Sequence, residues 1–418
     1  MSTPTTRAVV TGLGIVAPNG TTVEQYWAAT LAGNCAIAPL PGEDFARYPA
    51  RNAGQVSDFD AAARIPGRLL VQTDRVTRLA LAAAEEALAD AGADTTTMTD
   101  YDLGVVTANA CGGFEFTHQE IRKLWTEGPE RVSVYESFAW FYAVNTGQIS
   151  IRHKMRGPSG VIVTEQAGGL DALGQCRRSL RQGTRLILGG GLDSAMDPWS
   201  WVLQHNSRIS THADPGTAFL PFDARATGYV PGEGGAILVV EDIEAARARG
   251  ASHSYGEITG YAATVDPRPG SDRPAGLTRA VRLALADAGL RPEDIDVVFA
   301  DCAGVTELDR AEASTIEAVF GPHGVAVAAP KALVGRLYAG GGALDAATAL
   351  LSMRDGVIPP CGNQLRPDPS YALDLVTNTP RTAELRHCLV LARGAGGFNA
   401  ALVLSATDPE TPTGGSAR

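Results

Sequence analysis

The sequence predicts a large α/β protein in which parallel strands are covered by helices on both faces. Three observations support this prediction: strand-like and helix-like runs alternate, their order occurs twice, and Gly-rich turns separate them. The chain has 418 residues, 44% hydrophobic and 19% charged, so it can bury a large core. Length alone permits one duplicated domain or two ordinary ones.

The first repeated element is an Ala/Leu-rich helix that ends at a glycine. Residues 75–92 read RVTRLALAAAEEALADAG, and residues 277–289 read LTRAVRLALADAG. Glycine is favoured just after a helix because it adopts the left-handed conformation without steric cost. An acidic loop and an apolar strand follow each helix, at 102–110 and 294–302.

Two later pairs of segments continue this parallel. The run 159–176 is predicted to form a strand, a tight turn and a helix, and the run 324–351 has the same parts with an insertion. Apolar strands then follow Gly-rich turns at 232–242 and 394–405. Chance similarity between Ala-rich helices is the simpler explanation of any one pair, but matching order across four elements favours duplication.

A duplicated unit places two sheets back to back, with shared helices buried between them. We expect two tightly packed halves, an N-terminal one at 1–250 and a C-terminal one at 251–406, because no low-complexity linker separates them. The remaining residues, 407–418, are polar and rich in Pro and Gly, and we expect a disordered tail there.

Composition excludes several classes of function. A net charge of -11 and a pI near 5.2 argue against binding to nucleic acid or to an anionic membrane surface. The six cysteines form no CxxC pair and no histidines cluster at ligand spacing, so we expect neither a metal nor a cofactor. Scattered cysteines and an N-terminus without an apolar leader or membrane helix predict a cytoplasmic protein.

Three motifs in order carry a resemblance to a known family. They are VVTGLGIVAPNG at 9–20, GPSGVIVTEQAGGLDA at 157–172 and FLPFDARATGYVPGEGGAILVVED at 219–242. Together they resemble the thiolase-fold β-ketoacyl synthases over nearly the whole chain. The resemblance implies a thiolase-like fold, in which duplicated βαβ halves form a five-layer αβαβα sandwich.

Working members of that family use a cysteine at the turn between a strand and a helix, here called the elbow (163–167), and two histidines. The matching positions of this chain hold Gln166, Asp301 and Arg336. A carboxamide has no ionisable nucleophilic form, so Gln166 cannot replace the cysteine. Arginine stays protonated, so Arg336 is a poor replacement for a histidine base. An ion pair between Asp301 and Arg336 is conceivable. Gln166 either fills the old pocket by hydrogen bonding or has a role in decarboxylation.

Loss of all three catalytic positions on an intact scaffold resembles the chain length factors, the ketosynthase β subunits of type II aromatic polyketide synthases. The resemblance implies a non-catalytic subunit of an acyltransferase complex, with no condensing activity of its own. Its partners would be a catalytic ketosynthase α subunit, in a heterodimer, and an acyl carrier protein. The resemblance also implies that this subunit lines the far end of the tunnel for the growing poly-β-ketone with Phe114, Thr117, Ile121, Trp199 and Ser200.

Helical spacing indicates independently that three of these residues lie on one face of a helix. Phe114, Thr117 and Ile121 fall on one face of a helix, and Leu124 and Trp125 extend the stripe. Periodicity alone favours an ordinary core stripe, whereas the resemblance favours a tunnel wall. Because Ile121 is smaller than an aromatic residue, a deep tunnel and a long product are expected.

A second feature is the density of aromatic residues between positions 135 and 142. Such a cluster suits a partner interface, but composition alone equally permits a buried local cluster. The five residues are Tyr135, Phe138, Trp140, Phe141 and Tyr142.

Two other functions remain open at this point. One is a malonyl-carrier-protein decarboxylase that supplies the acetyl primer, since a Gln elbow accompanies that activity in some synthase-like domains. Those domains retain the histidines, however, which this chain lacks. The other is a homodimeric protein that binds acyl chains without a synthase partner.

Overall fold

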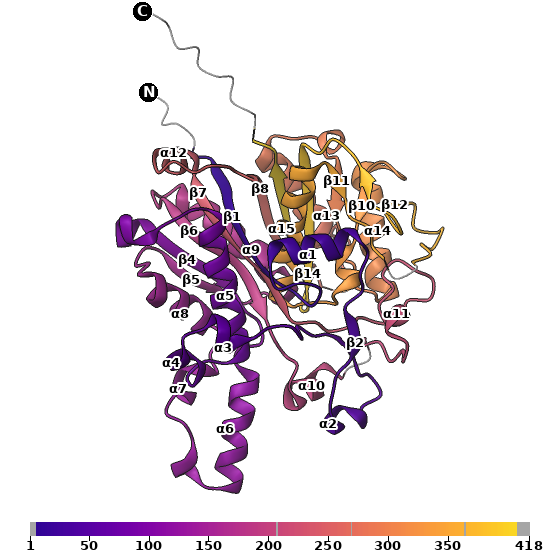
Figure 1. The fold of residues 1–418 in the computed structure, drawn as a ribbon. Coiled ribbons are helices and arrows are strands. Elements are labelled where there is room, and N and C mark those ends of the chain that lie inside the picture. Colours follow the sequence, from indigo (N-terminus) through magenta and orange to yellow (C-terminus); the bar gives the residue numbers. More distant parts are fainter. Residues whose placement is uncertain (1–5, 206–207, 269, 363–364, 408–418) are drawn as a thin grey trace, which may run out of the picture.

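A computed structural model describes residues 6–205, 208–268, 270–362 and 365–407. Within these residues, backbone hydrogen bonds join eleven strands into one large sheet, and helices cover it (Figure 1). The two halves of the chain occupy separate regions of that sheet, and each builds its region with the same order of strands. The expectation for the tail at 407–418 falls, apart from Thr407, outside the described residues.

The first half of the chain forms one end of the sheet. Its strands are β1 (Ala8–Val16), β4 (Leu103–Ala108), β5 (Ser159–Ile162), β6 (Leu186–Asp193) and β7 (Gly234–Asp242). They lie in the order β5, β4, β6, β7, β1, with β5 at the outer edge. The first three are parallel to one another, and β7 is antiparallel to both of its neighbours.

The second half repeats this arrangement. Its strands are β8 (Gly256–Val265), β9 (Val297–Phe299), β10 (Ala326–Ala328), β12 (Asp374–Leu375), β14 (His387–Gly394) and β15 (Phe398–Ser405). The order β10, β9, β14, β15, β8 matches that of the first half, and β12 adds a strand at the far edge. The four repeated elements read from the sequence occupy equivalent places, which confirms the duplication.

The repeated helices lie on equivalent outer faces. They are α5 (Arg75–Asp90) in the first half and α13 (Gly276–Ala288) in the second. Each helix is followed by a glycine with positive φ, Gly92 at +57° and Gly289 at +70°, as the sequence predicts. The outer layers are completed by α8 (Val144–His153) and α14 (Thr306–Phe320).

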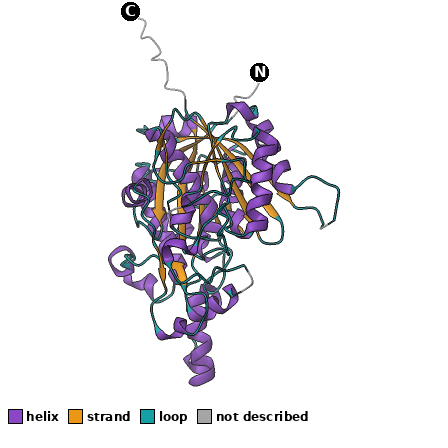
Figure 2. Ribbon diagram, turned by 90° about the vertical axis from the view of Figure 1, so that its right-hand side faces the viewer, coloured by secondary structure: helices purple, strands orange, loops and turns teal. Residues whose placement is uncertain are grey.

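Two further helices, α9 (Gly168–Leu180) and α15 (Ala339–Asp355), form the central layer. Both pack against strands of both halves. Every residue from Ala339 to Ser352 is buried, and this run is rich in Gly and Ala, so backbone can approach α15 closely from either side. The five layers are therefore α5/α8, the first set of strands, α9/α15, the second set, and α13/α14 (Figure 1). Figure 2 shows from a second direction that helices lie on both sides of the strands.

The two sets of strands meet at one edge rather than standing wholly apart. Residues Val9 and Val10 of β1 pair with Glu257 and Gly256 of β8. The strands diverge beyond this point, where α9 and α15 separate them. The arrangement is thus a sandwich whose two sheets share a short hydrogen-bonded seam.

The segment after β4 projects from the sandwich. It contains α6 (Phe114–Thr126) and α7 (Glu136–Ala139), and we call residues 113–143 the α6–α7 arm. Figure 1 shows α6 extending away from the sheet. Its base is fixed by Asp74, the N-cap of α5, whose carboxylate accepts hydrogen bonds from the backbone N–H groups of Val76 and Phe116, both at 2.8 Å.

Short elements connect these layers. The helices among them are α1 (Val23–Leu31), α2 (Glu43–Ala46), α3 (Ala61–Arg64), α4 (Gly67–Leu70), α10 (Pro198–Gln204), α11 (Pro215–Ala218) and α12 (Ile243–Ala248). Two small sheets pair β2 (Ile37–Pro39) with β3 (Asn52–Gly54), and β11 (Val357–Ile358) with β13 (Arg381–Thr382). None of the helices in the described ranges is long and apolar enough to cross a membrane.

The close approach of α15 to β7 predicts the cost of adding one methyl group. A Cβ at Gly340 would lie 2.0 Å from the carbonyl oxygen of Gly234, so Gly340→Ala should destabilise the protein by about 1–3 kcal/mol. Gly147, inside α8, has no atom within 4 Å of its Cβ position, so Gly147→Ala should be neutral or stabilising by up to about 1 kcal/mol. Melting temperatures of the two variants test this difference, and equal effects would contradict it.

Candidate functional site

The elbow lies between β5 and α9, where a 3-10 turn (Glu165–Ala167) leads into the helix. Gln166 is 5% exposed, and its side chain lines a cavity. Among the described residues, no hydrogen-bond partner is found for its carboxamide. The two roles considered for Gln166, filling the pocket and assisting decarboxylation, stay predictions.

The cavity has a volume of about 570 Å³ and brings together the three positions that the sequence singled out. Gln166 comes from the elbow, Asp301 follows β9, and Arg336 precedes α15. Tyr338 and Arg393 also line it, as do Gly394–Gly397 in the turn between β14 and β15. These elements meet because the duplicated halves close around α9 and α15.

Asp301 and Arg336 form the ion pair that the sequence allowed. Two nearly parallel contacts join them, Nη1 to Oδ2 at 3.0 Å and Nη2 to Oδ1 at 3.2 Å. Arg336 also donates to the backbone carbonyls of Asp301 and Arg393, both at 3.1 Å. Both side chains are buried, and this bidentate geometry offsets much of the desolvation cost of the two charges.

Neighbouring polar groups form a network around this ion pair. Asp301 accepts a hydrogen bond from the backbone N–H of Arg393 at 3.0 Å, and Lys331 lies 2.6 Å from Asp345 nearby. Burial raises the pKa of Asp301, but the charges of Arg336 and Lys331 outweigh it and hold the pKa below its usual value. Asp301 therefore stays ionised and paired, so it is unsuited to carry a proton as a histidine would.

Thiols near the site offer no substitute for the missing nucleophile. Burial raises the pKa of Cys111, Cys176 and Cys302 well above the ordinary value of a thiol. Each therefore remains protonated near neutral pH, and a thiol attacks far more slowly than a thiolate. Within the described ranges, no group of three or more His, Cys, Asp or Glu side chains is placed to hold a metal ion.

Glu165 is a site residue that sequence reasoning missed. Its carboxylate accepts a hydrogen bond at 2.6 Å from the backbone N–H of Ala395, in the turn between β14 and β15. Glu165 has a φ of +53°, which is uncommon for a residue with a side chain. A glutamate directly before Gln166 was the available signal, but its partner is 230 residues away and invisible to local patterns.

The five residues expected to line a tunnel lie outside this cavity, on α6 and α10. Phe114 and Trp199 contact each other edge to face, with ring centroids 5.3 Å apart. Ser200 is buried, and its hydroxyl donates to the backbone carbonyl of Asp197 at 3.1 Å. Thr117 is half-buried one turn above Phe114, whereas Ile121 is 38% exposed.

The α6 stripe is not a core stripe of this chain. Ile121 and Leu124 are partly exposed and Trp125 is 82% exposed, so the interpretation from periodicity alone was wrong. Trp140 and Phe141 of the aromatic cluster contact each other and also remain exposed. The α6–α7 arm thus exposes several large apolar side chains, which is typical of surfaces that bind a partner.

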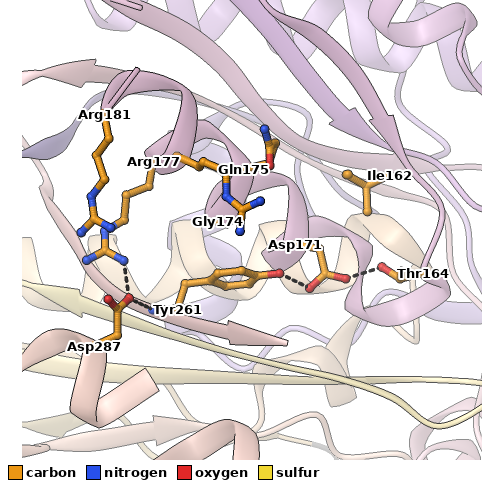
Figure 3. Close-up of a pocket in the computed structure, with 10 residues that line it drawn as sticks. Ile162, Thr164, Asp171, Gly174, Gln175, Arg177, Arg181, Tyr261 and Asp287 are labelled. Carbon is orange, nitrogen blue, oxygen red and sulfur yellow. Dashed lines mark hydrogen bonds and ion pairs between the residues drawn. The ribbon is translucent and has the colours of Figure 1, made fainter. Parts of the chain in front are cut away.

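A second cavity, of about 470 Å³, lies further along α9 and does not include the three degenerate positions. Figure 3 shows the hydroxyl of Tyr261, from β8, directed at Asp171, which Thr164 also contacts. Arg177 forms an ion pair with Asp287 of α13. These contacts connect α9 with the second half, so the cavity marks the polar part of the junction between the halves.

Comparisons with known proteins agree with this geometry. The N-terminal domain of β-ketoacyl synthases matches residues 5–246, and the C-terminal domain matches residues 255–364. The chain is 63% identical over 397 residues to the actinorhodin polyketide β-ketoacyl synthase 2 of Streptomyces coelicolor, covering 95% of this chain and 98% of that protein. It is 59% identical to the tetracenomycin polyketide synthase ketoacyl synthase beta subunit of Streptomyces glaucescens, covering 97% and 99%.

Solved structures are similar over the same length. The ishigamide ketosynthase/chain length factor superposes with a TM-score of 0.88 at 28% identity, covering 96% of this chain and 99% of the other. AntDE:AntF, described as a type II acyl-carrier protein in complex with its ketosynthase bound to the hexaketide, superposes with a TM-score of 0.87 at 25% identity, covering 96% and 100%. The thiolase-like fold expected from the sequence is confirmed.

The buried ion pair predicts a non-additive effect on stability. Asp301→Ala should destabilise the protein by about 3–5 kcal/mol, because it leaves the Arg336 charge buried without a carboxylate. The double variant Asp301→Asn, Arg336→Met should recover much of that loss, since no uncompensated charge remains.

Melting temperatures of the single and double variants test this prediction. Glu384→Ala is the control, because its ion pair with Arg386 is exposed and should contribute less than about 1 kcal/mol. A double variant less stable than Asp301→Ala would contradict the argument.

Proposed function

The chain belongs to the β-ketoacyl synthase family, and from that premise we propose that it is the chain length factor, or ketosynthase β subunit, of a type II polyketide synthase. In this role it pairs with a catalytic ketosynthase α subunit and helps to set the length of the poly-β-ketone. Its named relatives at 59–63% identity are polyketide synthase subunits of this type. The names of both solved structures also describe ketosynthase complexes.

The observation that carries the proposal is the state of the cavity. It keeps the position of a ketosynthase active site but holds Gln166 in place of a nucleophile and a closed Asp301–Arg336 ion pair in place of two imidazoles. A condensing enzyme needs a thiolate to carry the acyl chain and neutral imidazoles to assist decarboxylation. Selection has thus preserved the scaffold for its shape rather than its chemistry.

The same cavity disfavours the decarboxylase alternative. Loss of carbon dioxide from a malonyl group leaves an enolate, which neutral hydrogen-bond donors stabilise. Here Arg336 is committed to Asp301, and the backbone N–H of Ala395 is taken by the carboxylate of Glu165. The carboxamide of Gln166 would therefore receive little help from these two donors in stabilising an enolate.

A partner is supported by the surface of the α6–α7 arm. Trp125, Trp140 and Ile121 are exposed there, and aromatic residues of this kind are enriched at protein interfaces. Strand β5 ends the sheet, so the hydrogen-bonding groups on its outer edge are also available to another chain. A ketosynthase covering this surface would bring its own tunnel against α6.

Chain length would then depend on the bulk of residues at the end of that tunnel. We assign this role to Phe114, Thr117 and Ile121, with Trp199 and Ser200 behind them. The proposal is supported by the contact between Phe114 and Trp199 and by the outward position of Ile121. A carrier protein would deliver extender units to the ketosynthase, and the pair would work in the cytoplasm, in keeping with six free thiols.

Pairing is the first test of this function. The chain, expressed with a tag beside the ketosynthase encoded with it, should co-purify as a one-to-one complex. The double variant Trp125→Asp, Trp140→Asp should weaken the complex because it places charges on the apolar arm. A chain that purifies alone as a soluble homodimer would favour the acyl-binding alternative instead.

Product length is the second test. In the reconstituted pair, Ile121→Trp should shorten the polyketide by one or more extension units, because indole fills space at the end of the tunnel. Arg122→Trp is the matched control, since its side chain is exposed and, as the next residue along α6, lies about 100° around the helix from Ile121. Product masses measure the effect, and an unchanged length with Ile121→Trp would count against the assigned lining.

A further inference from the structure

His118 of α6 belongs to the same face as the proposed tunnel lining, one turn after Phe114. Its ring lies 6.3 Å from that of Trp199, which in turn contacts Phe114. The side chain is about one-third exposed on the arm that we expect the ketosynthase to cover. An imidazole among apolar side chains at this place is not needed to fill space.

The carboxylate of Asp197, just before α10, lies close to this imidazole. Its Oδ2 lies 3.7 Å from His118 Nδ1, within the range of an ion pair but beyond that of a hydrogen bond. The carboxylate is itself fixed, because Oδ1 accepts a hydrogen bond at 2.7 Å from the backbone N–H of Ser200 and thereby caps α10. His118 Nδ1 is therefore directed at a rigid acceptor, which leaves Nε2 to face elsewhere.

A second observation concerns the other carboxylate oxygen. Asp197 is 8% exposed, and its Oδ2 is buried without a hydrogen-bond partner among the described residues. A buried carboxylate oxygen left unsatisfied is costly, and such groups in folded proteins usually have a function or acquire a partner on binding. A small rotation of the His118 ring would satisfy it.

We propose that His118, oriented by Asp197, is a specificity-determining residue that recognises the keto and enol oxygens of the enclosed poly-β-ketone. This inference rests on the proposed function and extends it from tunnel length to tunnel chemistry. A 1,3-dicarbonyl chain presents a carbonyl acceptor in its keto form and an O–H donor in its enol form. Imidazole matches both, because Nε2 donates when the ring is protonated and accepts when it is neutral.

The consequence is that His118 distinguishes a poly-β-ketone from an alkyl chain in the tunnel. A polyketide chain with alternate keto groups gains a hydrogen bond at His118, whereas an alkyl chain of the same length leaves Nε2 of His118 without a hydrogen-bond partner. The hydrocarbon side chains of Phe114 and Ile121 cannot make this distinction, because they contact both kinds of chain through dispersion alone.

The test compares two variants in the reconstituted pair with its carrier protein. His118→Leu removes the polar group at similar bulk, and His118→Asn keeps a donor and an acceptor. With malonyl units alone, His118→Leu should lower the fraction of full-length product about tenfold, the equivalent of one hydrogen bond, while His118→Asn stays within about threefold of the native chain.

A starter without keto groups supplies the decisive control. When the pair is primed with an octanoyl group, the leading carbons that reach α6 carry no oxygen, so His118→Leu should match the native chain. Equal losses for His118→Leu and His118→Asn, or the same loss with both primers, would overturn the proposal. Melting temperature and co-purification show whether each variant folds and pairs.

Asp197→Asn covers the case in which His118→Leu fails to pair. Asparagine still accepts the hydrogen bond from Ser200, so α10 stays capped, but the charge that orients the imidazole is lost. A smaller loss of full-length product is expected with malonyl units and none with octanoyl priming. If Ile121→Trp shortens the product while these variants change nothing, this inference fails alone. If Ile121→Trp is also without effect, the assigned tunnel fails with it.

Discussion

The ion pair between Asp301 and Arg336 is the contact on which the centre of this molecule depends. It joins the end of β9 to the segment before α15, and through the carbonyl and N–H of Arg393 it also includes β14. Two charges in a buried cavity are tolerated only as a well-formed pair with its remaining donors and acceptors satisfied. Asp301 and Arg336 thus hold together the walls of the cavity.

The layered packing of the duplicated fold depends on other contacts than those of this cavity. Helices α9 and α15 pack between two equivalent sets of strands, and this packing involves small residues and backbone. Gly340, for example, meets the carbonyl of Gly234 so closely that no side chain fits. Residues that line the cavity at the ends of strands can therefore change while the layers remain.

Two features of the surface are unfavourable for a single chain. The α6–α7 arm exposes Ile121, Trp125 and Trp140, and Asp197 retains an unsatisfied oxygen within the described part of the chain. Both features are unfavourable for an isolated protein and become reasonable once a second subunit and an enclosed chain are present. The arm is anchored by Asp74, so its position relative to the sandwich is defined before any partner binds.

The sequence alone determined the duplicated α/β architecture, the family, and the absence of cysteine and histidine at positions 166, 301 and 336. These properties are local: helix and strand periodicity, glycines at helix ends, and a carboxamide at Gln166 can each be read from a short window. Only the tertiary structure decided that Gln166 lacks a hydrogen-bond partner among the described residues, that Glu165 reaches Ala395, and that the α6 stripe faces outward. Such contacts join residues far apart in the chain, and periodicity specifies that a helix has an apolar face without specifying what covers it.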